Sequence, residues 1–238
     1  GSTQDYYNED LLYKMFGINA ELLIDHAWGY EPVTMDLIKS YRPETNCISS
    51  GQVLHCAMDF TKTKIIVREM AEQLAMDLMA KKLVTDQIVL TIGYDVDNVK
   101  KAGYQGTVVT DRYGRKIPKH AHGSVNLGGH TSSTRDIMGK TLALYDSIID
   151  SSLWVRRVTI VANHVIRERE KKETNYQQMQ LFMEPEADEE KREKERKMQE
   201  ALIRVKNKYG KNAILKGMNL QEGGTTIERN SQIGGHKA

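Results

Sequence analysis

The sequence lacks the features that define disulfide-stapled, membrane-spanning and secreted proteins. Its 238 residues include only two cysteines, four prolines and three phenylalanines. Cys47 and Cys56 lie on one extended segment, too far apart to form a disulfide easily. This use of cysteine is typical of proteins from a reducing cytoplasm. No apolar run approaches the roughly 20 residues that span a bilayer, and no signal peptide precedes the first helix. We therefore expect a cytoplasmic protein without a membrane partner.

Recognisable catalytic motifs are also missing: there is no nucleophile elbow, P-loop or dinucleotide fingerprint. Asp95 and Asp97 end a strand, where paired carboxylates can bind Mg²⁺, but no second acidic cluster ends another strand. His120, His122 and His130 could suggest a transition-metal site, yet no cysteine or carboxylate lies nearby at ligand spacing. We interpret both groups as polar turn or hairpin residues and predict no catalytic residue and no metal site.

What is present is a core of moderate size and an uneven charge. Hydrophobic residues make up 39% of the chain, and its net charge is only +2. Residues 1–44 are acidic, whereas residues 45–170 are mildly basic. A basic middle beside an acidic start suggests a nucleic-acid surface.

The first 45 residues favour a small helical unit and a linker. Apolar spacing predicts helices over 9–16 and 20–28, separated by Gly17-Ile18-Asn19. In a helix-hairpin-helix-like unit, Gly17 and Asn19 would lie where backbone amides hold a DNA phosphate. An ordinary helical hairpin would explain the pattern equally well. Residues 31–45, with two prolines, are expected to be a linker.

The pattern then becomes β-α-β-β-α-β. Strands are expected over 47–57, 87–94, 123–129 and 154–165, and helices over 61–83 and 133–150. This order predicts an α+β fold: a four-stranded antiparallel sheet with two helices on one face and a polar, open second face. Ser133 offers an N-cap for the second helix. Residues 95–122 are expected to form a long hairpin that turns near Asp111–Gly114.

Hydroxyl and basic residues cluster at three places in this pattern, on the first strand, at the start of the second helix and on the last strand. Arginine supplies charge, serine and threonine supply short hydrogen bonds, and glycine lets backbone amides approach a phosphate. A generic polar face would explain each cluster singly, but the three together favour nucleic acid. The candidate DNA-binding residues here are Ser49, Ser50, Gly51, Gln52, Ser132, Ser133, Thr134, Arg135, Arg156 and Arg157.

Residues 168–238 are expected to form a flexible tail. Gln178, Leu181 and Phe182 belong to a small apolar group in highly charged surroundings. An apolar group on a tether can be buried by a partner, although it could also fold back onto its own domain. A charged helix is expected from 184 to 209, with acids first and bases last, as the helix dipole favours. Residues 215–238 are glycine- and threonine-rich, which favours a peptide over a domain.

Four stretches and two segments of the tail, in order, resemble the C-terminal part of a Y-family translesion DNA polymerase of the DinB/UmuC type. The match covers nearly the whole chain, and its order is more specific than any one motif. The family hairpin is shorter than 95–122, and His55 stands where proline is usual. The stretches that carry the resemblance are 14–29, 48–54, 131–135, 155–158, and 213–219 with 229–237.

The resemblance implies a partial thumb at 1–30, a little-finger domain at 46–167, and a grip on primer–template DNA during error-prone translesion synthesis. The family's palm and fingers, which hold its metal-binding carboxylates, would precede residue 1. No catalytic residue is therefore carried over, and Mg²⁺ is expected only for the parent polymerase. Gln178, Leu181 and Phe182 are similar to the Gln-x-x-Leu-Phe peptides that bind replicative sliding clamps. The alternative is a non-catalytic module with a ferredoxin-like sheet that binds a protein.

Overall fold

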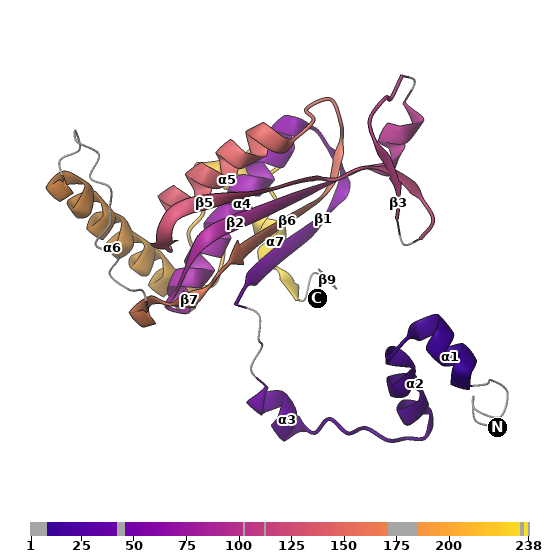
Figure 1. Cartoon of the computed structure of the whole chain (residues 1–238). Coiled ribbons are helices and arrows are strands. Elements are labelled where there is room, and N and C mark those ends of the chain that lie inside the picture. The colour runs from indigo at the N-terminus through magenta and orange to yellow at the C-terminus, as the bar shows by residue number, and fades with distance from the viewer. Residues whose placement is uncertain are drawn as a thin grey trace. The chain divides into compact units, whose positions relative to one another are not determined.

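The computed structural model describes residues 9–41, 46–101, 103–111, 113–170, 185–233 and 236–237 (Figure 1). The chain divides into two compact units, Gly1–Thr45 and Asn46–Ala238. In the part of the chain that is described, no helix combines the length and the apolar character needed to cross a bilayer.

The described residues of the N-terminal unit, 9–41, form three short helices. The predicted helices at 9–16 and 20–28 are confirmed, and the turn between them uses Gly17 at a φ of 58°, which favours glycine. The third helix is a correction, because it lies inside the predicted linker. It forms because Thr34 caps it, accepting a hydrogen bond from the amide of Leu37 at 3.2 Å. The helices are α1 (Glu9–Phe16), α2 (Asn19–Ala27) and α3 (Met35–Ser40).

The second unit has the predicted β-α-β-β-α-β order and an antiparallel sheet with the strand order β1-β6-β2-β5. A fifth strand, β7, pairs with β2 and corrects the predicted count of four. It can pair because β2 begins at Leu83, before the predicted start at 87. The elements of this domain are β1 (Ile48–Met58), α4 (Phe60–Ala80), β2 (Leu83–Tyr94), β5 (Ala121–Thr131), α5 (Thr134–Ile148), β6 (Val155–Asn163) and β7 (Ile166–Arg167).

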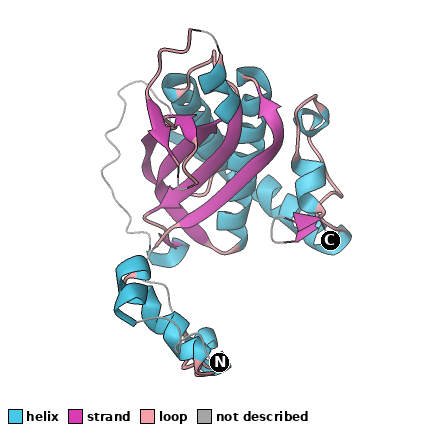
Figure 2. Cartoon of the chain, turned by 90° about the vertical axis from the view of Figure 1, so that its right-hand side faces the viewer, coloured by secondary structure: helices cyan, strands magenta, loops and turns pink. Residues whose placement is uncertain are grey.

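Helices α4 and α5 pack together against one face of the sheet, and the other face is left open (Figure 2). Ile88, Leu90 and Ile160 are fully buried in the core between these layers. Close contact of α5 with β5 requires Gly123, because a Cβ there would lie 2.9 Å from the Cγ2 of Ile148. Burying the apolar face of the sheet in this way fixes which residues face the opposite side.

An insertion extends from the end of β2 and contains the 3-10 helix η2 (Val96–Lys100) and a hairpin of β3 (Val108–Thr110) and β4 (Lys116–Pro118). The predicted turn near Asp111 is confirmed. The Gly114 amide donates to the Asp111 carbonyl at 2.9 Å, and the Asp111 carboxylate accepts from the amide of Arg115 at 2.9 Å. The carboxylate thus closes the hairpin by satisfying its turn amides.

The described part of the tail is ordered secondary structure rather than the flexible tail that was predicted. The charged helix is confirmed as α6 (Pro185–Tyr209). The last stretch folds back onto the domain, which corrects its interpretation as a peptide, because buried polar groups of the domain find their partners there. Its elements are η4 (Gly217–Leu220), α7 (Thr226–Asn230), β8 (Gln232–Ile233) and β9 (His236–Lys237).

Candidate nucleic-acid interface

The open face of the sheet consists of the residues that alternate with the buried core residues. On β2 and β6, buried Ile88, Leu90, Val158 and Ile160 alternate with exposed or half-exposed neighbours, which are polar residues or glycine except for Val89 and Val161. The strand registers align these neighbours in rows; one row joins Gly51, Thr159, Thr91 and His122 across the sheet. The polar residues and glycines of this open face are Ser49, Gly51, Gln87, Thr91, Gly93, His122, Ser124, Asn126, Arg157, Thr159 and Asn163.

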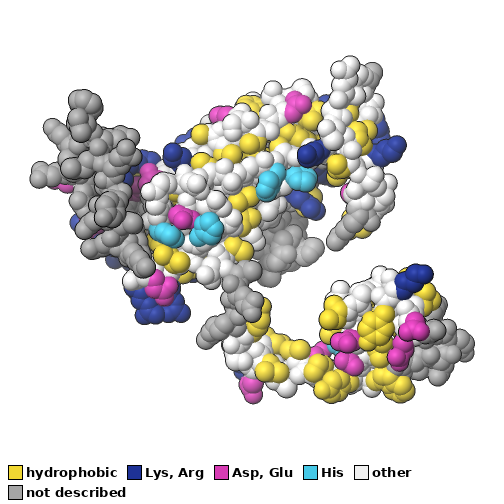
Figure 3. All heavy atoms as spheres, viewed as in Figure 1, with side chains coloured by type: hydrophobic (Ala, Val, Ile, Leu, Met, Phe, Trp, Pro, Cys, Tyr) yellow, Lys and Arg dark blue, Asp and Glu magenta, His cyan; other side chains and the backbone are white. Residues whose placement is uncertain are grey.

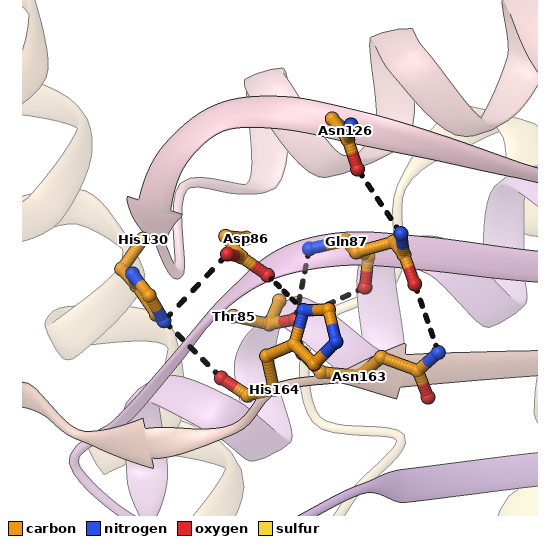
Figure 4. A network of polar contacts seen from close by, with 7 residues as sticks. All are labelled: Thr85, Asp86, Gln87, Asn126, His130, Asn163 and His164. Atoms are coloured by element: carbon orange, nitrogen blue, oxygen red, sulfur yellow. Dashed lines mark hydrogen bonds and ion pairs between the residues drawn. The ribbon is translucent and has the colours of Figure 1, made fainter.

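A chain of side-chain amides crosses three adjacent strands at one end of this face (Figure 4). Asn163 on β6 donates through Nδ2 to the Oε1 of Gln87 on β2 at 3.0 Å. Gln87 in turn donates through Nε2 to the Oδ1 of Asn126 on β5 at 3.1 Å. Because each amide orients the next, the three side chains are held in place as hydrogen-bonding groups.

Two histidines share one carboxylate beside this chain of amides (Figure 4). The Nδ1 of His164 lies 2.8 Å from the Oδ1 of Asp86, and the Nε2 of His130 lies 4.0 Å from its Oδ2. A second pair, His120 and His122, has ring centroids 6.2 Å apart. Figure 3 shows histidine side chains in two pairs over the sheet. No group of three or more His, Cys, Asp or Glu residues within the described ranges is placed to hold a metal ion.

A β-bulge places both Arg156 and Arg157 at the exposed end of β6. Val155 and Val158 are both buried although they are three residues apart, and the register with β2 shifts between Gly93 and Tyr94. The two arginines between the valines are therefore both exposed. Strict alternation of the strand would have placed only one of them away from the core.

Asp95 and Asp97 lie close to these arginines, and both carboxylates have partners within the protein. Arg156 reaches the carboxylate of Asp95 with its Nε at 3.8 Å, and that carboxylate also caps η2 by accepting from the Asp97 amide at 2.9 Å. The ammonium of Lys100 donates to the Asp97 carboxylate at 2.7 Å, which lowers the pKa of Asp97. Gly93 leaves room for Arg157, because a Cβ at 93 would lie 3.2 Å from the Arg157 Cβ.

The predicted cluster on β1 is split between the two faces of the sheet. Ser49 and Gly51 lie on the open face, whereas Ser50 and Gln52 alternate to the covered face and contact the C-terminal segment. The Nη2 of Arg229 donates to the Ser50 hydroxyl at 3.0 Å, and the Thr225 hydroxyl lies 3.4 Å from the Oε1 of Gln52. Ser50 and Gln52 are thus bonded within the protein, and their role as DNA contacts stays a prediction.

Glu69 explains why the C-terminal segment docks there, and sequence reasoning missed it. Its carboxylate is 3% exposed within α4 and accepts from the Nδ2 of Asn219 at 2.9 Å and from the Thr225 amide at 2.8 Å. Burial lowers the pKa of the Arg229 guanidinium nearby, against the opposing effect of the Glu69 charge. The signal that could have revealed it is an acidic residue directly before Met70 in an apolar helix stripe, because a buried carboxylate needs a hydrogen-bonding partner.

The predicted cluster of Ser132–Arg135 does come together at the start of α5, but side chains of α6 cover it. Ser133 caps α5 as predicted, accepting from the Asp136 amide at 3.2 Å. Its hydroxyl also donates to Glu195, and Gln199 donates to Thr134 and to the carbonyl of Ser132. Arg135 contributes its backbone amide to the same Glu195 carboxylate at 2.9 Å. These four residues are therefore engaged by the tail.

The remaining candidate residues belong to other parts of the chain. Gly17 lies at the α1–α2 turn, and Asn19 is the first residue of α2, in the separate N-terminal unit. Gln178, Leu181 and Phe182 lie outside the described residues. The structure therefore does not test either group.

The fold first defines the class: an α+β domain with one covered sheet face and one open, hydrogen-bonding face. The impB/mucB/samB family C-terminal domain then matches residues 49–181, more than half of the chain, and the chain belongs to this family. The resemblance to the C-terminal part of a UmuC-type Y-family polymerase is thereby confirmed.

A curated relative agrees with this assignment. UvrX of Bacillus subtilis (strain 168), whose name assigns it to the repair of UV damage, is 29% identical to the chain over 233 residues. The match takes in 96% of this chain and 47% of UvrX. The chain therefore spans about half the length of this relative.

Proposed function

We propose that this chain is the DNA-gripping and clamp-tethering part of an error-prone translesion polymerase that acts in the cytoplasm on damaged DNA. The observation that carries the proposal is the open face, where hydroxyls, amides and imidazoles in register end at the bulged pair Arg156 and Arg157. Membership of the family and the name of UvrX support the same setting.

The open face suits a phosphate backbone better than a protein partner. Ser49, Thr91 and Thr159 can donate short hydrogen bonds to phosphate oxygens, while the arginines supply charge and displace counterions. The alternative, a protein-binding module, would need a connected aliphatic or aromatic patch. Val53 is 62% exposed and Val89 pairs with half-exposed Val161, but the row of Gly51, Thr159, Thr91 and His122 separates these aliphatic side chains. Contacts of this kind grip the backbone without reading sequence.

The phosphoryl-transfer chemistry and its Mg²⁺ are proposed for the parent protein rather than for these residues. The carboxylates that could be considered, Asp95 and Asp97, are committed to capping η2 and to pairing with Arg156 and Lys100. They do not fit a Mg²⁺ site, and we derive no catalytic step from them.

The DNA grip is tested by the double variant Arg156→Ala, Arg157→Ala. We expect about a tenfold loss of affinity for primer–template DNA, and a slope of log affinity against log salt that is smaller by about two, because two phosphate contacts disappear. Fluorescence anisotropy over a salt series measures both. Lys191→Ala with Lys194→Ala, exposed on α6, removes the same charge and should change affinity much less. Equal losses in the two double variants would contradict the proposal.

The clamp tether is proposed from the pattern Gln178, Leu181 and Phe182 alone. Leu181→Ala with Phe182→Ala should abolish binding to a replicative sliding clamp, because the apolar anchors are lost, and should leave DNA affinity unchanged. Surface-immobilised clamp and anisotropy with DNA measure the two activities separately. Met179→Ala with Gln180→Ala changes the positions that the pattern leaves free and serves as the control. Unchanged clamp affinity in the first variant would refute the tether.

A further inference from the structure

Helix α6 places the carboxylate of Glu195 against the start of α5. Both oxygens of Glu195 accept hydrogen bonds from the Ser133 hydroxyl, at 3.0 and 3.1 Å, and one also accepts from the Arg135 amide at 2.9 Å. An amide and a hydroxyl converging on an anion at a helix N-terminus form the arrangement that proteins use for phosphate. Here an anion from the protein itself occupies it.

A second side chain one helical turn further along α6 secures the same contact. Gln199 is 3% exposed and donates to the Thr134 hydroxyl at 2.5 Å and to the Ser132 carbonyl at 3.3 Å. Glu195 and Gln199 are four residues apart, so they lie on one face of the helix. This pair of side chains covers Ser132–Arg135 together.

The two halves of α6 are held differently. The half that covers α5 does so through Glu195 and Gln199, and both make polar contacts with the start of α5. The later half lies against α4, where Leu202 and Lys206 line a small cavity with Met76 and Glu72. The first half is thus held to α5 by polar contacts, whereas the contacts of the second half with α4 include apolar side chains.

We propose that α6 is an intramolecular competitor of DNA, in which Glu195 occupies a phosphate position and must leave before Ser133 and the Arg135 amide can bind the backbone. This inference rests on the proposed DNA-binding function. The tail would then set the strength of the grip. When α6 covers the start of α5, only the open sheet face and the arginine pair can bind DNA. When α6 has moved away, the start of α5 adds a phosphate contact.

The test is the affinity of the full chain for primer–template DNA after Glu195→Gln, compared with Glu200→Gln. Both variants remove one negative charge from α6, but the Glu200 carboxylate accepts from Arg196 on α6 itself. We expect Glu195→Gln to bind about fivefold more tightly than the control, because the uncovered form becomes more populated. Adding Ser133→Ala to Glu195→Gln should remove this gain, because the phosphate then loses its hydroxyl donor.

Hydrogen exchange on the wild-type chain provides a second readout that does not depend on a variant folding. Addition of DNA should increase exchange in the first half of α6, residues 190–199, and leave 200–209 unchanged. Suppose that the wild type and the control bind DNA, but Glu195→Gln binds no more tightly than the control or exchange does not increase. That result would overturn the proposal that α6 competes with DNA and would leave the proposed function standing. No DNA binding by any of these proteins would overturn both.

Discussion

The two faces of the sheet are built from the same strands but have opposite chemistry. On β6, Ile160 is fully buried in the core with α4 and α5, whereas Thr159, its immediate neighbour, lies half-exposed on the open face. On β1, Ser50 is bonded to Arg229 of the tail, while Ser49 faces the open side. The covered face stabilises the fold, and the open face is left with groups that can bind something else.

The strongest test of this division compares Ile160→Ala with Thr159→Ala. Truncating Ile160 should lower the free energy of unfolding by about 3 kcal/mol, because it removes buried methyl groups and leaves a cavity. Truncating Thr159 should change it by no more than about 0.5 kcal/mol, as at surface positions. Urea denaturation measures both. A similar loss for both variants would show that the open face is also buried, by a contact that is not part of this fold.

The next effect concerns the polar part of the covered face, where the C-terminal segment docks. Glu69→Ala should cost about 2 kcal/mol, because the Thr225 amide and the Asn219 side chain lose a buried acceptor. Residues 211–233 should then become accessible to limited proteolysis, whereas Glu69→Gln, which keeps an acceptor, should protect them better. Unchanged proteolysis of Glu69→Ala would mean that this segment is held by other contacts.

Sequence patterns predicted the covered face well because its determinants are local. Alternation around Ile88, Leu90 and Ile160 identified the strands, and Ser133 with Asp136 identified the start of α5. The four long strands and both packed helices therefore followed from residues near one another in the chain. The short strand β7 did not, because it depends on how far β2 extends past β6.

The candidate site was less predictable because it depends on contacts between distant residues. Ser50 could be assigned to the covered face only with the position of Arg229, and the cluster at Ser133 only with that of Glu195. The bulge at Arg156 and Arg157 depends on the register with β2, which alternation within β6 does not reveal. Composition indicated residue types that can bind phosphate, and tertiary packing decided which of them remain open.

The finest test separates two adjacent serines on opposite faces. Ser49→Ala should weaken binding to primer–template DNA by about threefold, because one hydrogen bond to a phosphate disappears. Ser50→Ala should leave DNA affinity unchanged but lower stability slightly, because half-buried Arg229 loses its acceptor. Anisotropy and urea denaturation of the two variants measure the pair of effects. Both variants remove the same hydroxyl from the same strand, so only the direction in which the side chain points can separate them. If Ser50→Ala weakens DNA binding as much as Ser49→Ala does, the grip extends beyond the open face, and the C-terminal segment must move aside when DNA binds.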